Sequence, residues 1–93
     1  MTLIFAREAK ETYASIQSQI LDRWNRSVLA KFEQKTIKVL NLIAESPLIY
    51  PATTQNPNVR KGMINKNCSV FYEVKAEHIE VLFFWDNRQE PIL

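Results

Sequence analysis

The sequence predicts an α+β fold in which one strand precedes a helical hairpin and a three-stranded antiparallel meander. Three observations support this prediction. Residues 2–6 form a short apolar run, residues 9–43 carry two apolar stripes with helical spacing, and residues 59–86 contain three strand-like runs separated by short turns. This order limits the fold to one small sheet with the hairpin on one of its faces.

Two helices are predicted between residues 9 and 46. In the first, apolar side chains recur at steps of three and four residues, at Tyr13, Ile16, Ile20 and Trp24. The second stripe runs from Leu29 to Ile43 and ends before Ser46-Pro47, because proline cannot continue a helix. Residues 25–27 break the pattern, and Ser27 is expected to cap the second helix. Because the link between the two helices is so short, they are predicted to pack as an antiparallel pair.

Residues 46–58 contain three prolines and no helical period, so they are predicted to cross as a loop to the meander. In the last strand, from residue 79 to 86, strict alternation places Ile79, Val81, Phe83 and Trp85 on one face. Leu82 and Phe84 then fall on the other. A sheet covered by helices on one side needs only one apolar face. We therefore expect Leu82 and Phe84 to be covered by the chain's own loop and tail or by a partner.

Composition narrows the class of protein. The chain has 93 residues, which predicts one domain spanning 1–93, and its net charge of +2 is too small to indicate nucleic-acid binding by itself. A single cysteine, Cys68, excludes an internal disulfide and suits a reducing compartment. A single glycine, Gly62, excludes a glycine-rich phosphate loop. No apolar run approaches the roughly 18 residues of a membrane span. We expect a soluble cytoplasmic protein.

The only histidine, His78, has no second histidine, cysteine or paired carboxylate at the spacing of a metal site. It also would have to serve every Ser-His-Asp or Cys-His arrangement that could be drawn in this chain. The sequence therefore predicts neither a metal site nor a cofactor.

Several short segments, taken in order, resemble the RelE/ParE toxin superfamily of type II toxin–antitoxin systems, and its ParE-like members more than the others. The resemblance covers nearly the whole chain and is carried by Trp24, Lys31-Phe32, Glu45-Ser46-Pro47, Val59-Arg60-Lys61, Phe71-Tyr72-Glu73-Val74 and Asp86-Asn87-Arg88-Gln89-Glu90-Pro91. It implies a small toxin neutralised by an antitoxin whose C-terminal segment wraps the helices and the sheet. Trp24, Leu82 and Phe84 are then the expected antitoxin contacts.

The resemblance implies one of two activities, since fold alone does not choose between them. RelE-like members cut mRNA on the ribosome, and ParE-like members poison DNA gyrase. Cleaving RNA through its 2′-hydroxyl needs a base, cations around the phosphate and an acid. In RelE-like enzymes an arginine precedes the tyrosine step of a strand, and a tyrosine or histidine lies near the C-terminus. Here Ser69 holds that arginine position and neither residue type follows Arg88. A gyrase inhibitor that acts by binding is therefore expected.

Four cations on or beside the meander are the predicted target contacts: Arg60, Lys61, Lys66 and Arg88. In the alternative of an mRNA endonuclease, they bind and polarise the phosphate, with Arg60, Lys61 and Arg88 as catalytic candidates and His78 or Tyr72 as the acid. A third alternative is an inactive member that keeps only antitoxin binding.

Plainer roles also fit these residues. Arg60, Lys61 and Lys66 suit solvated surface, Arg88 can pair with Asp86 or Glu90, and Tyr72 suits the core. The expected partners are an antitoxin and either gyrase or the ribosome with its mRNA. A homodimer and a heterotetramer with the antitoxin both stay open.

Overall fold

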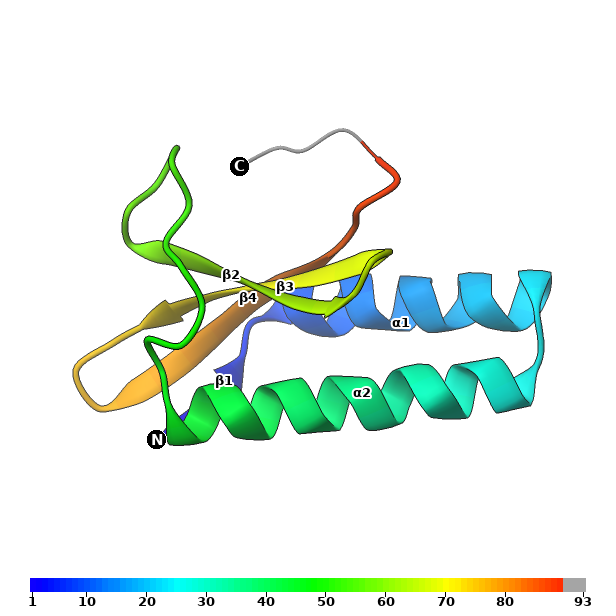
Figure 1. Ribbon diagram of the computed structural model, residues 1–93, viewed down its shortest axis with the longest axis horizontal. Helices are drawn as coiled ribbons and strands as arrows, with labels where there is room; N and C mark the ends of the chain where they lie inside the picture. The colour runs from blue at the N-terminus through cyan, green and yellow to red at the C-terminus, as the bar shows by residue number, and fades with distance from the viewer. Residues whose placement is uncertain (90–93) are drawn as a thin grey trace.

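A four-stranded sheet lies against two long helices in the computed structural model, which describes residues 1–89 (Figure 1). The elements are, in chain order, β1 (Thr2–Phe5), α1 (Arg7–Arg23), α2 (Arg26–Glu45), β2 (Val59–Asn65), β3 (Cys68–Val74) and β4 (His78–Asp86). The predicted order of elements and the antiparallel meander are confirmed. The sheet as a whole is mixed, because β1 adds parallel to β4 in the order β1-β4-β3-β2. Glu90 and Pro91 of the family-like C-terminal segment lie outside the described residues.

The helical hairpin turns at Trp24 and Asn25. The backbone N–H of Trp24 donates to Ile20 O (2.8 Å) and closes α1. The side chain of Asn25 then accepts from Val28 N–H (3.0 Å), so Asn25 is the N-cap of α2. The prediction of Ser27 as the cap was wrong, because the extended backbone that a cap requires belongs to Asn25 and Ser27 already lies inside the helix.

The main core lies between the hairpin and the helix-covered face of the sheet. β1 adds Leu3 and Phe5 as partly buried neighbours. The buried members come from every other element: Ala9, Phe32, Ile43, Ile64, Cys68, Val70, Tyr72, Ile79, Val81 and Phe84. In the part of the chain that the structure describes, no helix is both long and apolar enough to cross a lipid bilayer.

A β-bulge at Leu82 reverses the faces of β4. Phe71 pairs with Phe83 while Tyr72 pairs with Val81, so Leu82 is the inserted residue. Val81 and Phe84 consequently both face the helices. Phe84 is 2% exposed. The expectation that Phe84 lies on the open face was therefore wrong, because strict alternation takes no account of an inserted residue. Its contact with an antitoxin stays a prediction.

The open face of the sheet does carry apolar side chains, although not the expected set. Val59, Phe71 and Phe83 are buried there, with Leu82 and Trp85 packed against them. The rings of Phe71 and Phe83 stack with their centroids 4.6 Å apart. Leu82 thus lies on the predicted face, half-buried. Phe83 and Trp85 join it there instead of Phe84, as the bulge requires.

Candidate functional site: a cationic cleft

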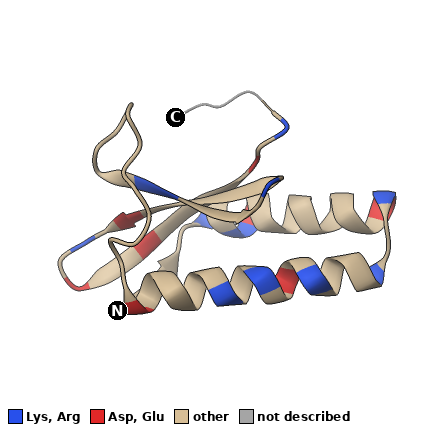
Figure 2. Cartoon of the chain, in the orientation of Figure 1, with Lys and Arg blue, Asp and Glu red and all other residues tan. Residues whose placement is uncertain are grey.

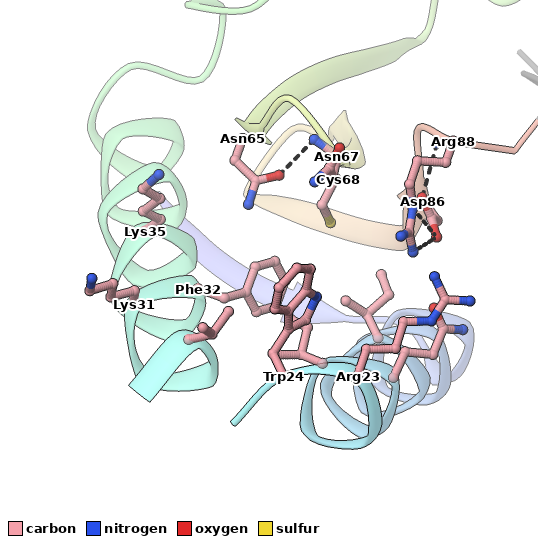
Figure 3. A pocket seen from close by; sticks show the side chains of 14 residues that line it. Arg23, Trp24, Lys31, Phe32, Lys35, Asn65, Asn67, Cys68, Asp86 and Arg88 are labelled. Atoms are coloured by element: carbon pink, nitrogen blue, oxygen red, sulfur yellow. Dashed lines mark hydrogen bonds and ion pairs between the residues drawn. The ribbon is translucent and has the colours of Figure 1, made fainter. Parts of the chain in front are cut away.

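A cleft of about 260 Å³ opens between the tip of the helical hairpin and one end of the sheet (Figure 3). It forms because the hairpin extends beyond the sheet at this end (Figure 1). Its walls come from three parts of the chain: the end of α1 with Arg23 and Trp24, the first half of α2, and the sheet end formed by the β2–β3 turn and the end of β4. Segments far apart in sequence therefore share one surface.

Among residues 1–89, four cationic side chains line this cleft, and Asp86 is the only carboxylate that does so. The cations are Arg23, Lys31, Lys35 and Arg88, and we call this surface the cationic cleft. Lys31 and Lys35 lie one turn apart on α2, so their side chains project from the same side of the helix. Figure 3 places them across the cleft from Asp86 and Arg88. Figure 2 shows that basic residues recur along α2. The surface is suited to an anionic group.

Asp86 and Arg88 form a two-point ion pair on one wall. Arg88 Nη2 lies 2.7 Å from Asp86 Oδ2, and Arg88 Nε lies 3.0 Å from Asp86 Oδ1. The Arg88 guanidinium holds the pKa of the Asp86 carboxyl below its usual range, and Asp86 in turn raises the pKa of Arg88. Pairing with Asp86, one of the plainer roles foreseen for Arg88, is confirmed. Asp86 is consequently a fixed negative charge beside Arg88.

The structure does not gather the other predicted cations at this site. Arg60 pairs with Tyr72, so it lies on the helix-covered face, where its Nη1 donates to Tyr50 O (2.7 Å) and ties the 46–58 loop to β2. Lys61 lies on the opposite face, with its Nζ 5.8 Å from the centroid of the Phe71 ring. Lys66 sits in the turn between Asn65 and Asn67, which both line the cleft. Of the four cations predicted from the sequence, only Arg88 lines the cleft, and Lys66 lies at its rim.

The two residues considered as acids in the endonuclease alternative lie away from the cleft. Tyr72 is fully buried, its hydroxyl donates to Pro47 O (2.8 Å), and burial raises its pKa. His78 begins β4, eight residues before Asp86, which is about 26 Å away at 3.3 Å per residue. Neither tyrosine nor histidine is among the described residues that line the cleft. The described site therefore offers charge without an evident proton donor.

Two small side chains near the end of β4 are structural. Ser69, at the position where the family pattern has arginine, is completely buried, and its hydroxyl donates to Asn87 Oδ1 (2.9 Å). Burial raises the pKa of the Cys68 thiol to about 12, with the nearby Asp86 charge adding to the effect, so this thiol stays protonated. Among residues 1–89 no three His, Cys, Asp or Glu side chains are grouped so that they could hold a metal ion.

The sequence predicted Arg88 as a target contact and Trp24 as an antitoxin contact, and both line the cleft. It did not predict Arg23, Lys31, Lys35 and Asp86 as parts of a site. Trp24 is 66% exposed at the hairpin tip and lines the cleft, and its contact with an antitoxin stays a prediction. The spacing of the two lysines, four residues apart on a predicted helix that begins beside Trp24, was a usable signal. No pattern in the sequence showed that this helix face meets the end of β4.

Comparison with solved structures places the fold among toxins. The chain aligns with a structure described as the chromosomal ParDE TA system from P. aeruginosa at a TM-score of 0.79 and 17% identity, over 92% of this chain and 95% of that one. A YoeB/ParE toxin from Agrobacterium tumefaciens aligns at 0.67 and 14% identity, over 92% and 98%. The YoeB dimer from Staphylococcus aureus aligns at 0.63 and 18% identity, over 89% and 92%.

These likenesses establish the fold of the RelE/ParE toxins, as the sequence resemblance predicted, and the ParDE structure has the highest TM-score of the three. No protein-family model matches the chain, and no curated protein matches it. The chain thus has the fold of these ParE and YoeB toxin structures, and its described residues form a cationic cleft.

Proposed function

We propose that this protein is the toxin of a type II toxin–antitoxin pair, that it acts in the cytoplasm by binding and inhibiting DNA gyrase, and that a cognate antitoxin neutralises it. The proposal is supported by the likeness to the ParDE structure over nearly the full length of both chains. The observation that carries the choice of target is the cationic cleft, whose lining residues within positions 1–89 offer four cations but neither histidine nor tyrosine.

The chemistry of RNA cleavage explains why this observation matters. A positioned proton-transfer group typically contributes about 10²–10⁴ in rate. In the cleft, Asp86 is an ionised carboxylate held by Arg88, which makes it a poor acid, and its lowered pKa makes it a poor base. Cys68 stays protonated and buried. The cations could stabilise a phosphate, but nothing in the described cleft supplies the proton transfers.

A binding role makes direct use of the same surface. Arg88 and Lys66 are the sequence-predicted cations nearest the cleft, and Arg23, Lys31 and Lys35 extend its charge along both helices. The exposed indole of Trp24 adds a large flat apolar contact, a residue type that often anchors protein interfaces. Arg60 and Lys61 are retained as outlying target contacts. For the antitoxin we propose contacts at Trp24 and Leu82.

A charge reversal on α2 tests the proposal. Purified protein should block supercoiling by gyrase or trap gyrase-cleaved DNA, and Lys35→Glu should weaken this inhibition. Lys38→Glu is a matched control, because Lys38 is exposed on the same helix but does not line the cleft. Gyrase left untouched, together with degradation of mRNA on ribosomes, would show that the proposed target is wrong.

The second candidate function is an mRNA endonuclease, favoured by the combination of a cationic cleft and an exposed tryptophan, which suits a phosphate beside a stacked base. In this case Arg88→Ala should abolish cleavage of ribosome-bound mRNA while leaving the chain folded. The third candidate, an inactive protein that only binds an antitoxin, is separated from both by expression without antitoxin. Unimpaired growth would favour it.

A further inference from the structure

We propose that Asp86 is a specificity-determining residue of the cationic cleft: it competes with the partner for Arg88, and so restricts the cleft to acidic protein segments that carry several negative charges. The inference rests on the proposed function, since it takes the cleft to be the surface that grips a protein target. Asp86 is not among the target contacts predicted from the sequence.

The geometry makes Asp86 the fixed member of the pair and Arg88 the movable one. Asp86 is the last residue of β4 and pairs with Cys68 across the sheet. Its side chain is 12% exposed, whereas that of Arg88 is 49% exposed. Arg88 follows the strand, in a turn closed by the bond from Gln89 N–H to Asp86 O (3.0 Å). An incoming anion can therefore reach the guanidinium more readily than it can displace the carboxylate.

The charges around the Asp86–Arg88 pair determine which partners can compete with Asp86 for Arg88. The two bonds from the guanidinium to Asp86 satisfy the same donors that a carboxylate or phosphate would use. Arg23 also lowers the pKa of Asp86, which places this second cation within electrostatic reach of the carboxylate. A partner with a single negative charge gains little, because it must replace an existing pair.

A partner with several negative charges gains more. It can engage Lys31 and Lys35 on the opposite wall while it takes over Arg88. Neither lysine has an ion-pair partner among the described residues. Because the proposed target is a protein, the favoured ligand is a run of acidic side chains, and selectivity for such a run follows from the cost of displacing Asp86.

Asp86→Asn is a near-isosteric test of this idea. The amide keeps an oxygen at the Oδ1 position, which accepts the backbone N–H of Arg88 (2.9 Å), so the turn should be retained. The substitution removes the negative charge and releases the guanidinium. From the Coulomb energy of one charge at about 6 Å in a well-solvated site, we expect binding of a fluorescein-labelled hexaglutamate peptide to tighten roughly three- to tenfold at low salt.

Three further measurements separate competition from a merely structural effect. The gain should shrink as salt rises from about 0.05 to 0.5 M, because a solvated charge effect is screened. Asp86→Glu should return the affinity towards that of the original protein. In a double-mutant cycle, Asp86→Asn should gain less when Arg88 is already replaced by Gln. Urea unfolding of each variant verifies that the fold is intact.

The outcomes are distinct. Unchanged peptide affinity in folded Asp86→Asn, or an equal gain with and without Arg88, would overturn the inference. So would tighter binding of a single-stranded oligonucleotide without tighter binding of the peptide. The proposed function fails separately: if Asp86→Asn tightens peptide binding yet neither protein inhibits gyrase, the competition stands and the target is wrong.

Discussion

Replacing Phe84 by alanine should destabilise the protein far more than replacing its neighbour Leu82. The difference arises from the β-bulge, which turns Phe84 into the main core and leaves Leu82 half-buried on the open face. A strand that alternated without the bulge would leave both side chains on the open face and give two costs of similar size. The pair of variants therefore tests the bulge directly.

The magnitude follows from the surroundings of Phe84. Its ring centroid lies 4.8 Å from that of Tyr13, which itself stacks on Phe32 at 5.5 Å. Truncating a buried phenylalanine costs about 3–5 kcal/mol, including the cavity left behind. For a 93-residue chain the whole free energy of unfolding is about 5–14 kcal/mol. Phe84→Ala should thus remove a large fraction of stability, and Leu82→Ala about 1 kcal/mol.

Urea unfolding at 25 °C, followed by far-UV circular dichroism, measures both free energies. A loss of about 4 kcal/mol also corresponds to a fall of roughly 15–30 °C in Tm for a domain of this size. Equal costs for the two variants, or a cost below 1 kcal/mol for Phe84→Ala, would refute the bulge and the assignment of faces that depends on it.

Three further predictions address other elements. Asn25→Ala should lower the free energy of unfolding in urea by about 1 kcal/mol, because it removes the cap of α2. Ser27→Ala should change it by less than about 0.5 kcal/mol. Equal costs for the two variants would contradict the assigned cap. Arg60→Ala should cost about 1.5–3 kcal/mol because it breaks the charged bond to Tyr50 O, while Lys61→Ala, whose cation–π contact is worth only about 0.5–1 kcal/mol at an exposed site, should cost less. Burial raises the pKa of Cys68 from 9.0 to about 12, so the folded state holds the thiol proton more tightly than the unfolded state does. The resulting stabilisation of the fold is complete below pH 9 and is lost as pH rises towards 12. Between pH 9 and 10.5 the free energy of unfolding should therefore fall by up to about 1.4 kcal/mol per pH unit relative to that of Cys68→Ala. If the free energies of the two proteins changed in parallel with pH, this prediction would be wrong.

Local sequence patterns were sufficient to predict an element where a helical or strand period, or one helix-breaking residue, determined it. The stripe from Tyr13 to Trp24 predicted α1, and the apolar spacing up to Ile43 before Pro47 predicted α2. In β3, Tyr72 lies in the core, as the plainer role expected for it predicted. These predictions succeed because helical and strand periods are properties of neighbouring residues, and no distant contact is needed to express them.

The face of β4 could not be predicted in the same way. A bulge inserts one residue relative to the partner strand, and the insertion is defined by the pairing of Phe71 and Tyr72 rather than by the letters of β4. One inserted residue moves every later side chain to the other face. Phe84 was therefore misplaced although the strand itself was located correctly.

The candidate site was only partly predictable for a related reason. Arg88 could be identified from its place after the last strand, but its proximity to Lys31 and Lys35 depends on how far the hairpin extends past the sheet. Arg60 and Lys61, adjacent in sequence, were expected to act together. They lie on opposite faces because consecutive side chains of a strand alternate.

The sequence by itself determined the number, order and approximate bounds of the helices and strands, and a resemblance that correctly named the fold. The tertiary structure alone decided that β1 joins parallel to β4, that a bulge directs Phe84 into the core, and that cations from α1, α2 and the end of β4 surround Asp86 in one cleft. The physical reason is range: periodicity and capping act within a few residues, whereas strand register and cleft assembly depend on contacts between segments separated by most of the chain.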